Sequence, residues 1–110
     1  MKYALHVRFN GARAALDALT PNERQVVFAE YESLRHTPGV IDGNQLHPSG
    51  TAVTLSIRDG QRHQTNGPVP GAVDGYYLFD APDLETVMTF AARIPAARMG
   101  GAVEIRRVYD

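Results

Sequence analysis

The sequence contains no cysteine, and this absence excludes disulfides, a thiolate nucleophile and a cysteine-ligated zinc ion. A strong charge of either sign is also missing, because 11 Lys and Arg nearly balance 12 Asp and Glu, for a formal net charge of -1. No basic field therefore favours nucleic acid or an anionic lipid surface as a partner. The four histidines lack the short spacings of zinc sites, so we predict no metal.

Long apolar runs are absent as well. The N-terminus begins at once with alternating apolar and polar residues, and it contains no apolar segment of the signal-peptide or membrane-spanning type. We therefore expect a cytoplasmic protein without membrane contact. A length of 110 residues with 44% hydrophobic residues is typical of a small globular protein with one modest core. We predict a single domain over residues 1–110.

Local patterns predict strands and helices along the whole chain. Strict alternation over residues 2–9 predicts a strand with one apolar face. The residues 20–23 (TPNE) combine a capping Thr, a Pro at the first helical position and a Glu that completes a capping box, and they predict a helix that ends near Arg35 or His36. Further strands are expected over 40–46, 51–58, 61–65, 73–80 and 101–109, with a second helix that starts at Pro82-Asp83.

Asp59-Gly60 is a tight-turn signal, so residues 51–65 are expected to form a hairpin. The resulting order of elements predicts an α+β fold of ferredoxin-like character, with an antiparallel sheet of four core strands and two helices on one face. We expect the apolar faces of all strands, including Val53, Leu55 and Ile57, to pack under these helices. The other faces are polar and carry His6, Arg8, Thr54, Ser56, Arg58, Glu104 and Arg106.

Two interpretations of this polar sheet face are open. It is either a bare face in water, as antiparallel sheets allow, or it packs on a second copy of itself. A closed dimer would enclose a partly polar interior suited to a ligand or to ion pairs. We prefer the homodimer, because one small sheet with two helices has a thin core.

Candidate site residues are few. His6 and His47 are candidate acid–base groups, because the charge of histidine changes near neutral pH, although we prefer a structural role for His6 and a turn role for His47. Arg8 and Arg58 are candidate anion ligands; the alternative for both is pairing with Glu104 across the sheet. The sequence contains no phosphate-binding, dinucleotide-binding or serine-hydrolase motif, so we predict no cofactor.

Two further segments are candidates for ligand binding. Tyr76 and Tyr77 are neighbours in a strand, so one ring enters the core while the other lines a pocket, and the pattern does not decide between them. Asn66, Gly67 and Pro68 restrict the backbone of a loop that we expect to be ordered at the end of the sheet, near the mouth of a cavity.

The chain resembles the YCII-related proteins of the DGPF type over nearly its whole length. The resemblance rests on MKYALHVRF, residues 45–48 (QLHP), 58–60 (RDG), 66–68 (NGP), 75–78 (GYYL) and the final VEIRRV. It implies a ferredoxin-like fold that dimerises into an α+β barrel, in a family whose members mostly have no established activity. Asn66 and Val69 replace the Asp and Phe of the motif, and an amide cannot take a proton as a carboxylate does.

Three functions follow from these observations. The first is a dimeric protein that binds a small polar or aromatic molecule in a cavity of the sheet face, without catalysis. The second is a cofactor-independent enzyme that uses His6 or His47 as acid and base. The third is a regulatory module, because the resemblance implies for some relatives a link to sigma-factor control.

Overall fold

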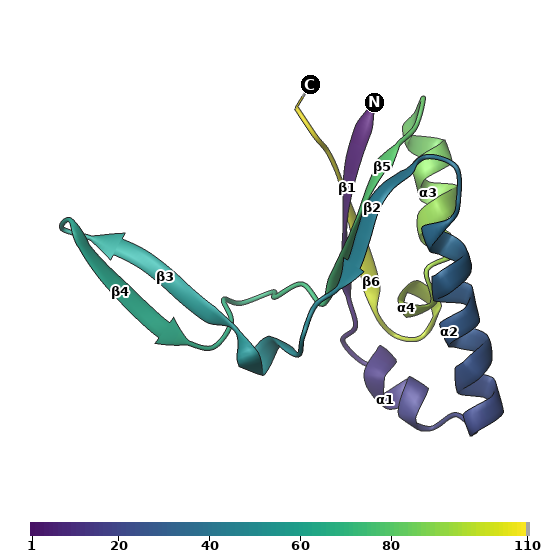
Figure 1. Ribbon diagram of the computed structural model, residues 1–110, viewed down its shortest axis with the longest axis horizontal. Coiled ribbons are helices and arrows are strands. Elements are labelled where there is room, and N and C mark those ends of the chain that lie inside the picture. Colours follow the sequence, from purple (N-terminus) through teal and green to yellow (C-terminus); the bar gives the residue numbers. More distant parts are fainter. Residues whose placement is uncertain (110) are drawn as a thin grey trace.

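The computed structural model describes residues 1–109. It combines a four-stranded sheet, helices on one face of that sheet, and a separate hairpin that extends from the other side (Figure 1). The elements are β1 (Lys2–Arg8), α1 (Ala12–Asp17), α2 (Pro21–Arg35), β2 (Val40–Gln45), the 3-10 turn η1 (Ser49–Thr51), β3 (Val53–Arg58), β4 (Gln61–Asn66), β5 (Gly75–Asp80), α3 (Leu84–Ala92), α4 (Pro95–Arg98) and β6 (Ala102–Arg107).

The four-stranded sheet has the order β2-β5-β1-β6, and each neighbouring pair is antiparallel. Leu5 in β1 lies opposite Tyr77 in β5 and opposite Ile105 in β6, so all three side chains share one face. The helices cover this face, and the other face is free of helices (Figure 1). The predicted α+β class with antiparallel strands is therefore confirmed.

The core lies between the sheet and the helices. The alternation in β1 buries Tyr3, Leu5 and Val7, as predicted. From the helical side Phe90 meets two strand residues: its ring lies 5.4 Å from that of Tyr77 in an edge-to-face arrangement and 4.6 Å from that of Phe79. Such aromatic contacts join α3 firmly to β5.

The long helix α2 begins as predicted, with a complete capping box. The Glu23 N–H donates to the Thr20 hydroxyl at 3.2 Å, and the Glu23 carboxylate accepts from the Thr20 N–H at 2.9 Å. These bonds lower the pKa of Glu23. The Ala-rich segment before it forms the short helix α1, which was not among the elements we predicted. Arg24 donates to the Leu19 carbonyl at 2.8 Å just after that helix.

The hairpin β3–β4 is not part of the four-stranded sheet. Its predicted turn is present, with positive φ at Asp59 (49°) and Gly60 (76°). Our placement of its side chains was wrong: Val53, Leu55 and Ile57 are not under the helices but 62%, 53% and 61% exposed. The reason is that β2 pairs with β5 and not with β3, so the chain carries the hairpin away from the sheet.

We call this hairpin, residues 53–66, the arm, and the rest of the molecule the body. Because the arm is separate, three polar residues that we had assigned to the face of His6 lie elsewhere. Thr54, Ser56 and Arg58 belong to the arm, whereas His6, Arg8 and Glu104 lie on the four-stranded sheet. Alternation shows that a segment has two faces, but it does not show which sheet the segment joins.

Candidate functional site

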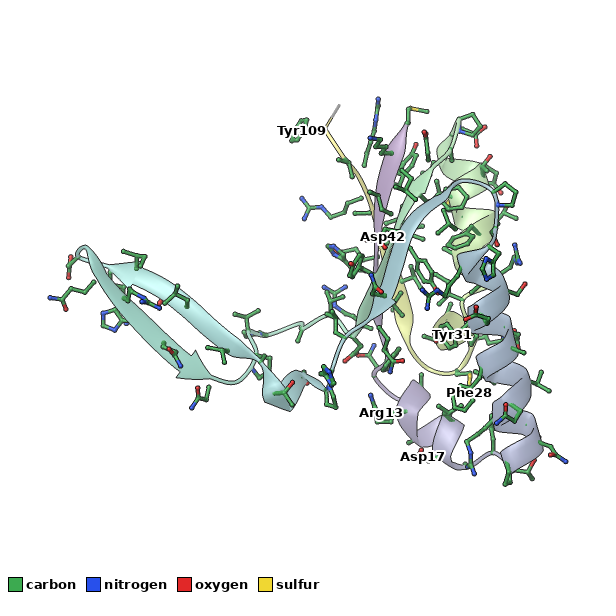
Figure 2. The ribbon with its side chains drawn as sticks, in the orientation of Figure 1. Arg13, Asp17, Phe28, Tyr31, Asp42 and Tyr109 are labelled. Atoms are coloured by element: carbon green, nitrogen blue, oxygen red, sulfur yellow. The ribbon has the colours of Figure 1, made fainter. Side chains whose placement is uncertain are left out.

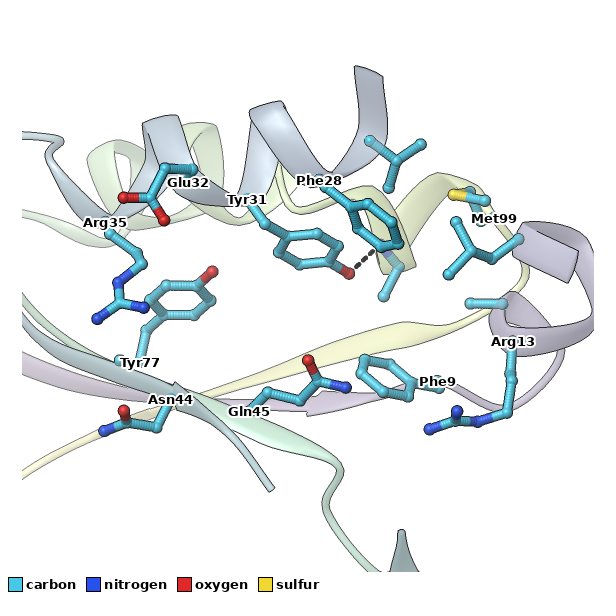
Figure 3. A pocket seen from close by; sticks show the side chains of 15 residues that line it. Phe9, Arg13, Phe28, Tyr31, Glu32, Arg35, Asn44, Gln45, Tyr77 and Met99 are labelled. Atoms are coloured by element: carbon cyan, nitrogen blue, oxygen red, sulfur yellow. Dashed lines mark hydrogen bonds between the residues drawn. The ribbon is translucent and has the colours of Figure 1, made fainter. Parts of the chain in front are cut away.

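A cavity of about 240 Å³ lies between the helix-covered face of the sheet and the helices α1 and α2 (Figure 3). Figure 2 shows Phe28 and Tyr31 extending from α2 on the side that faces the sheet. Most of the cavity surface is apolar, and this apolar part is lined by Phe9, Ala12, Leu16, Val27, Phe28, Tyr31, Ala96 and Met99. Polar groups are contributed by Arg13, Glu32, Arg35, Asn44, Gln45 and Tyr77.

The charged groups lie at the two ends of the cavity. Figure 3 shows Arg35 and Glu32 near Tyr77 at one end, and Arg13 with Phe9 and Met99 at the other. The Arg13 guanidinium is 5.5 Å from the centre of the Phe9 ring, a cation–π distance. The two arginines therefore have different surroundings: Arg13 stacks on an aromatic ring, while Arg35 lies beside a phenol.

The strand β2 makes room for the ring of Tyr77. Gly43 lies directly opposite Tyr77 in the sheet, and a Cβ atom at Gly43 would approach the ring's Cδ1 to 2.5 Å. Any other residue would displace the ring, so the glycine determines where Tyr77 lies. In the sequence, Gly43 looked only like an interruption of a weak strand.

Both phenols of the cavity are protonated at neutral pH. Burial raises the pKa of Tyr77 to about 12; the nearby phenol of Tyr31 adds to this shift, and the guanidinium of Arg35 opposes it. Burial also raises the pKa of Tyr31, whose oxygen accepts a 3.2 Å bond from the Ala96 N–H. A neutral phenol donates a hydrogen bond and does not act as a base. The two tyrosines are therefore suited to hold an oxygen atom of a ligand.

Arg35 has no internal carboxylate partner within residues 1–109. The ion pairs of the neighbouring acids go elsewhere: Glu32 contacts His36 at 3.2 Å and Glu30 contacts Arg98 at 2.6 Å. A guanidinium at the mouth of an apolar cavity, with its donors unused, is suited to a carboxylate or a phenolate.

The uncovered face of the sheet carries a polar network. His6 Nδ1 lies 3.3 Å from Glu104 Oε1, and Arg8 Nη1 lies 3.9 Å from the same oxygen. Arg8 also donates from Nε to the Gly71 carbonyl at 3.0 Å. The alternative in which Arg8 pairs with Glu104 is therefore the one that the structure shows. His6 shares this carboxylate, so the two predicted residues lie together.

Tyr76 belongs to the same face and not to the cavity. Its hydroxyl donates to Asp42 Oδ2 at 3.3 Å and accepts from Asn44 Nδ2 at 3.0 Å, and Figure 2 shows Asp42 on β2. Of the two neighbouring tyrosines, Tyr77 lines the cavity. Ligand binding by Tyr76 at the polar sheet face stays a prediction, and Tyr77 is the tyrosine that lines the cavity on the helix side.

The other predicted site residues are dispersed. His47 is exposed between β2 and η1, and Arg58 ends β3 at the tip of the arm. Asn66 is exposed at the end of β4, and Gly67 closes the base of the arm through a 2.7 Å bond from its N–H to the Ala52 carbonyl. Pro68 lines an open hollow together with Arg8, so the loop does lie at the end of the sheet.

Sequence reasoning missed Arg35 and the cavity between the helix and the sheet. A signal was present, because Phe28, Tyr31 and Arg35 recur at helical spacing on α2 and share one side of it. The stripe that we expected to enter the core is the neighbouring one of Val27, Tyr31 and Leu34, and the structure does bury Val27 and Leu34. Phe28, Tyr31 and Arg35 line the cavity beside it.

Two kinds of feature, a cluster of metal ligands and a membrane-spanning helix, are absent from the described part of the chain. Residues 1–109 contain no cluster of three or more His, Cys, Asp or Glu side chains that could hold a metal ion. Over the same residues, no helix has the length and apolar character needed to cross a bilayer.

The chain is similar to known proteins in both sequence and structure. The family model of the YCII-related domain matches residues 1–110. A solved structure, 5-chloro-2-hydroxyhydroquinone dehydrochlorinase from Burkholderia phenoliruptrix in complex with 2,5-dihydroxybenzoquinone, is similar with a TM-score of 0.53 and 14% identity. The similarity covers 99% of this chain and 94% of the other. At this identity the similarity shows a shared fold. No curated protein matches the sequence.

Proposed function

The chain belongs to the YCII-related family, and from this premise we propose that it binds a small aromatic molecule with an anionic oxygen. The proposed site is the cavity between α1, α2 and the sheet. The observation that carries the proposal is a mostly apolar cavity with two groups at one end: the Arg35 guanidinium, which has no carboxylate partner among residues 1–109, and the protonated Tyr77 hydroxyl.

The size and lining of the cavity define the ligand class. Its volume of about 240 Å³ is below the roughly 300–1,000 Å³ of pockets for drug-sized ligands, so one ring with small substituents fits. Phe28, Tyr31 and Met99 offer aromatic and sulfur contacts to that ring. The anionic oxygen would lie between Arg35 and Tyr77, where a charge-assisted bond orients it. The 2,5-dihydroxybenzoquinone bound by the dehydrochlorinase is a single-ring compound of the same size class.

We propose binding without catalysis. Neither His6 nor His47 is among the residues that line the cavity, and the one carboxylate among them, Glu32, lies against His36. A proton-transfer reaction needs a base within hydrogen-bond reach of the substrate. No observation favours the enzyme that uses His6 or His47, or the sigma-factor module; both stay predictions.

We further propose that this protein is a ferredoxin-like homodimer joined through its uncovered sheet face. The spatial order β2-β5-β1-β6, with both long helices on one face, is compatible with this topology. The uncovered face carries Ala4 and Leu78 half-buried among the His6–Glu104 and Tyr76–Asp42 contacts. A self-complementary face of this kind suits a two-fold interface.

The ligand proposal is tested with benzoate and its neutral isostere benzamide, followed by NMR titration. Benzoate is expected to shift the amide signals of Tyr31, Arg35 and Tyr77, and Arg35→Gln is expected to weaken benzoate by about tenfold while leaving benzamide unchanged. The matched control is Arg93→Gln, because Arg93 is an arginine outside the cavity. Equal affinity of Arg35→Gln and the native protein for benzoate would overturn the proposal, as would shifts centred on His6 and Tyr76.

A further inference from the structure

The arm has two chemically different faces. On one face Val53, Leu55 and Ile57 lie opposite Asn66, Gln64 and Arg62, and on the other face all six residues are polar: Thr54, Ser56, Arg58, Gln61, His63 and Thr65. Every residue of the arm except Thr54 is exposed. The apolar side of β3 therefore forms a continuous aliphatic stripe in contact with water.

A ribbon of this kind is not stable by itself. A hairpin of two strands is marginal in water unless its apolar face packs on a further strand or a helix. At its base the Gly67 N–H donates to the Ala52 carbonyl and the Thr54 hydroxyl donates to the Gly67 carbonyl, each at 2.7 Å, so these bonds close the hairpin. They leave its stripe uncovered, and burial of the stripe requires a surface outside residues 1–109.

The direction of the arm indicates where that surface lies. In Figure 1 the arm leaves the body on the side of the uncovered sheet face, away from α2 and α3. A second molecule seated on the uncovered face is therefore within reach of the arm. One side of the chain thus presents two β surfaces without cover, and two-fold symmetry allows each copy to cover those of the other.

We propose that the arm clasps a second copy of this chain, with Val53, Leu55 and Ile57 packed against the partner. The proposal rests on the homodimer proposed above and adds the element that holds it together.

Interface area supports this assignment. Four strands about 4.8 Å apart, of six or seven residues each at about 3.3 Å per residue, give a sheet face of roughly 400 Å². Two such faces would bury roughly 800 Å², which is below the lower limit of about 1,200 Å² for a stable interface. Each arm, about 10 Å by 20 Å, adds roughly 400 Å² when both contacting surfaces are counted. Two arms bring the total to about 1,600 Å², the usual size of a stable interface.

The first experiment compares two triple variants of the full chain by sedimentation velocity over a range of concentrations. Val53→Ser/Leu55→Ser/Ile57→Ser removes the stripe, and the dimer dissociation constant is expected to rise at least about 100-fold. Ser56→Ala/His63→Gln/Thr65→Ser changes the polar face of the same ribbon and is expected to dissociate within about threefold of the native protein. NMR signals of the buried Phe79 and Phe90 report whether each body remains folded.

The second experiment locates the arm. Since the chain contains no cysteine, Gln61→Cys accepts a single spin label near the tip of the arm. In mixed dimers of labelled protein and isotope-enriched native protein, the label is expected to broaden amide signals of the enriched partner. Absence of broadening in the enriched partner would overturn the clasp.

The outcomes separate the two proposals. A native protein that is monomeric at micromolar concentration overturns the dimer and the clasp together. A dimer that persists unchanged in the stripe variant overturns the clasp and leaves the sheet-face dimer standing. Neither result bears on benzoate binding, which is measured independently.

Discussion

The body and the arm are built from the same kind of alternating strand, but only the body buries its apolar side chains. Leu5 in β1 is 0% exposed, and Leu55 at the corresponding place in β3 is 53% exposed. Both strands have an apolar face, and both pair antiparallel with a neighbour. The difference is that helices cover the face of β1, whereas no element within residues 1–109 covers the face of β3. An amphipathic strand specifies a buried face, whereas the topology decides what buries it.

The largest expected effect is the difference in unfolding free energy between alanine substitutions of these two leucines. Leu5→Ala should reduce the free energy of unfolding by about 2–5 kcal/mol, because it leaves a cavity in a closely packed core. Leu55→Ala should change it by less than about 0.5 kcal/mol at concentrations where the protein is monomeric. Denaturant unfolding at low protein concentration measures both. A large loss for Leu55→Ala under these conditions would mean that the arm packs on its own body.

A second comparison concerns two glycines. Gly43→Ala places a Cβ atom against the Tyr77 ring and should cost about 1–3 kcal/mol while displacing that ring from the cavity. Gly50, in η1 just before the arm, has no atom within 4 Å of such a Cβ, so Gly50→Ala should be close to neutral. Unfolding and benzoate titration of both variants provide the measurement. Unchanged binding in Gly43→Ala would show that the position of Tyr77 is unimportant for the site.

Alkaline pH should affect the body through Tyr77. Its folded pKa is raised from 10.0 to about 12, so burial of the neutral phenol stabilises the protein fully below pH 10. Above pH 10 the unfolded chain ionises first, and this stabilisation is lost as the pH rises toward 12. Stability measured from pH 8 to pH 12 should therefore fall less in Tyr77→Phe than in the native protein. Tyr76→Phe is the matched control. If the stability of Tyr76→Phe fell as little over this pH range as that of Tyr77→Phe, the assignment of the effect to Tyr77 would be contradicted.

The smallest effect is expected at the junction of arm and body. Asn66→Asp should change stability by less than about 0.5 kcal/mol, because Asn66 is exposed and either residue suits the end of a strand before a loop. We also expect no new activity in a screen of small hydroxylated aromatic compounds. Turnover that appears only in Asn66→Asp would show that this position takes part in proton transfer.

The sequence predicted most of the fold because its signals are local. The capping box at Thr20 and Glu23, the alternation of Tyr3, Leu5 and Val7 and the turn at Asp59-Gly60 each depend on neighbours a few residues away. For the same reason these elements are found where we expected them. The antiparallel sheet with its helices on one face followed from the order of the elements along the chain.

The candidate site was less accessible to sequence reasoning. His6 and Arg8 were grouped correctly because they lie two positions apart on one strand, but their shared partner is a carboxylate of the same chain. Arg35 and Tyr77 were missed as a pair because they are 42 positions apart and meet only across the gap between α2 and β5. Gly43 leaves room for the Tyr77 ring and so allows Tyr77 and Arg35 to lie close together. This role of Gly43 can be recognised only when the residue opposite it in the sheet is known.

The sequence by itself therefore determined the strands and the two longer helices of this protein, their faces and the class of fold, because these depend on short-range sterics, capping and periodicity. Only the tertiary structure decided that β3 leaves the sheet, that Tyr77 and not Tyr76 lines the cavity, and that Arg35 pairs with no acid among residues 1–109. These features depend on contacts between distant segments, and the choice among such contacts is a competition that local patterns do not encode.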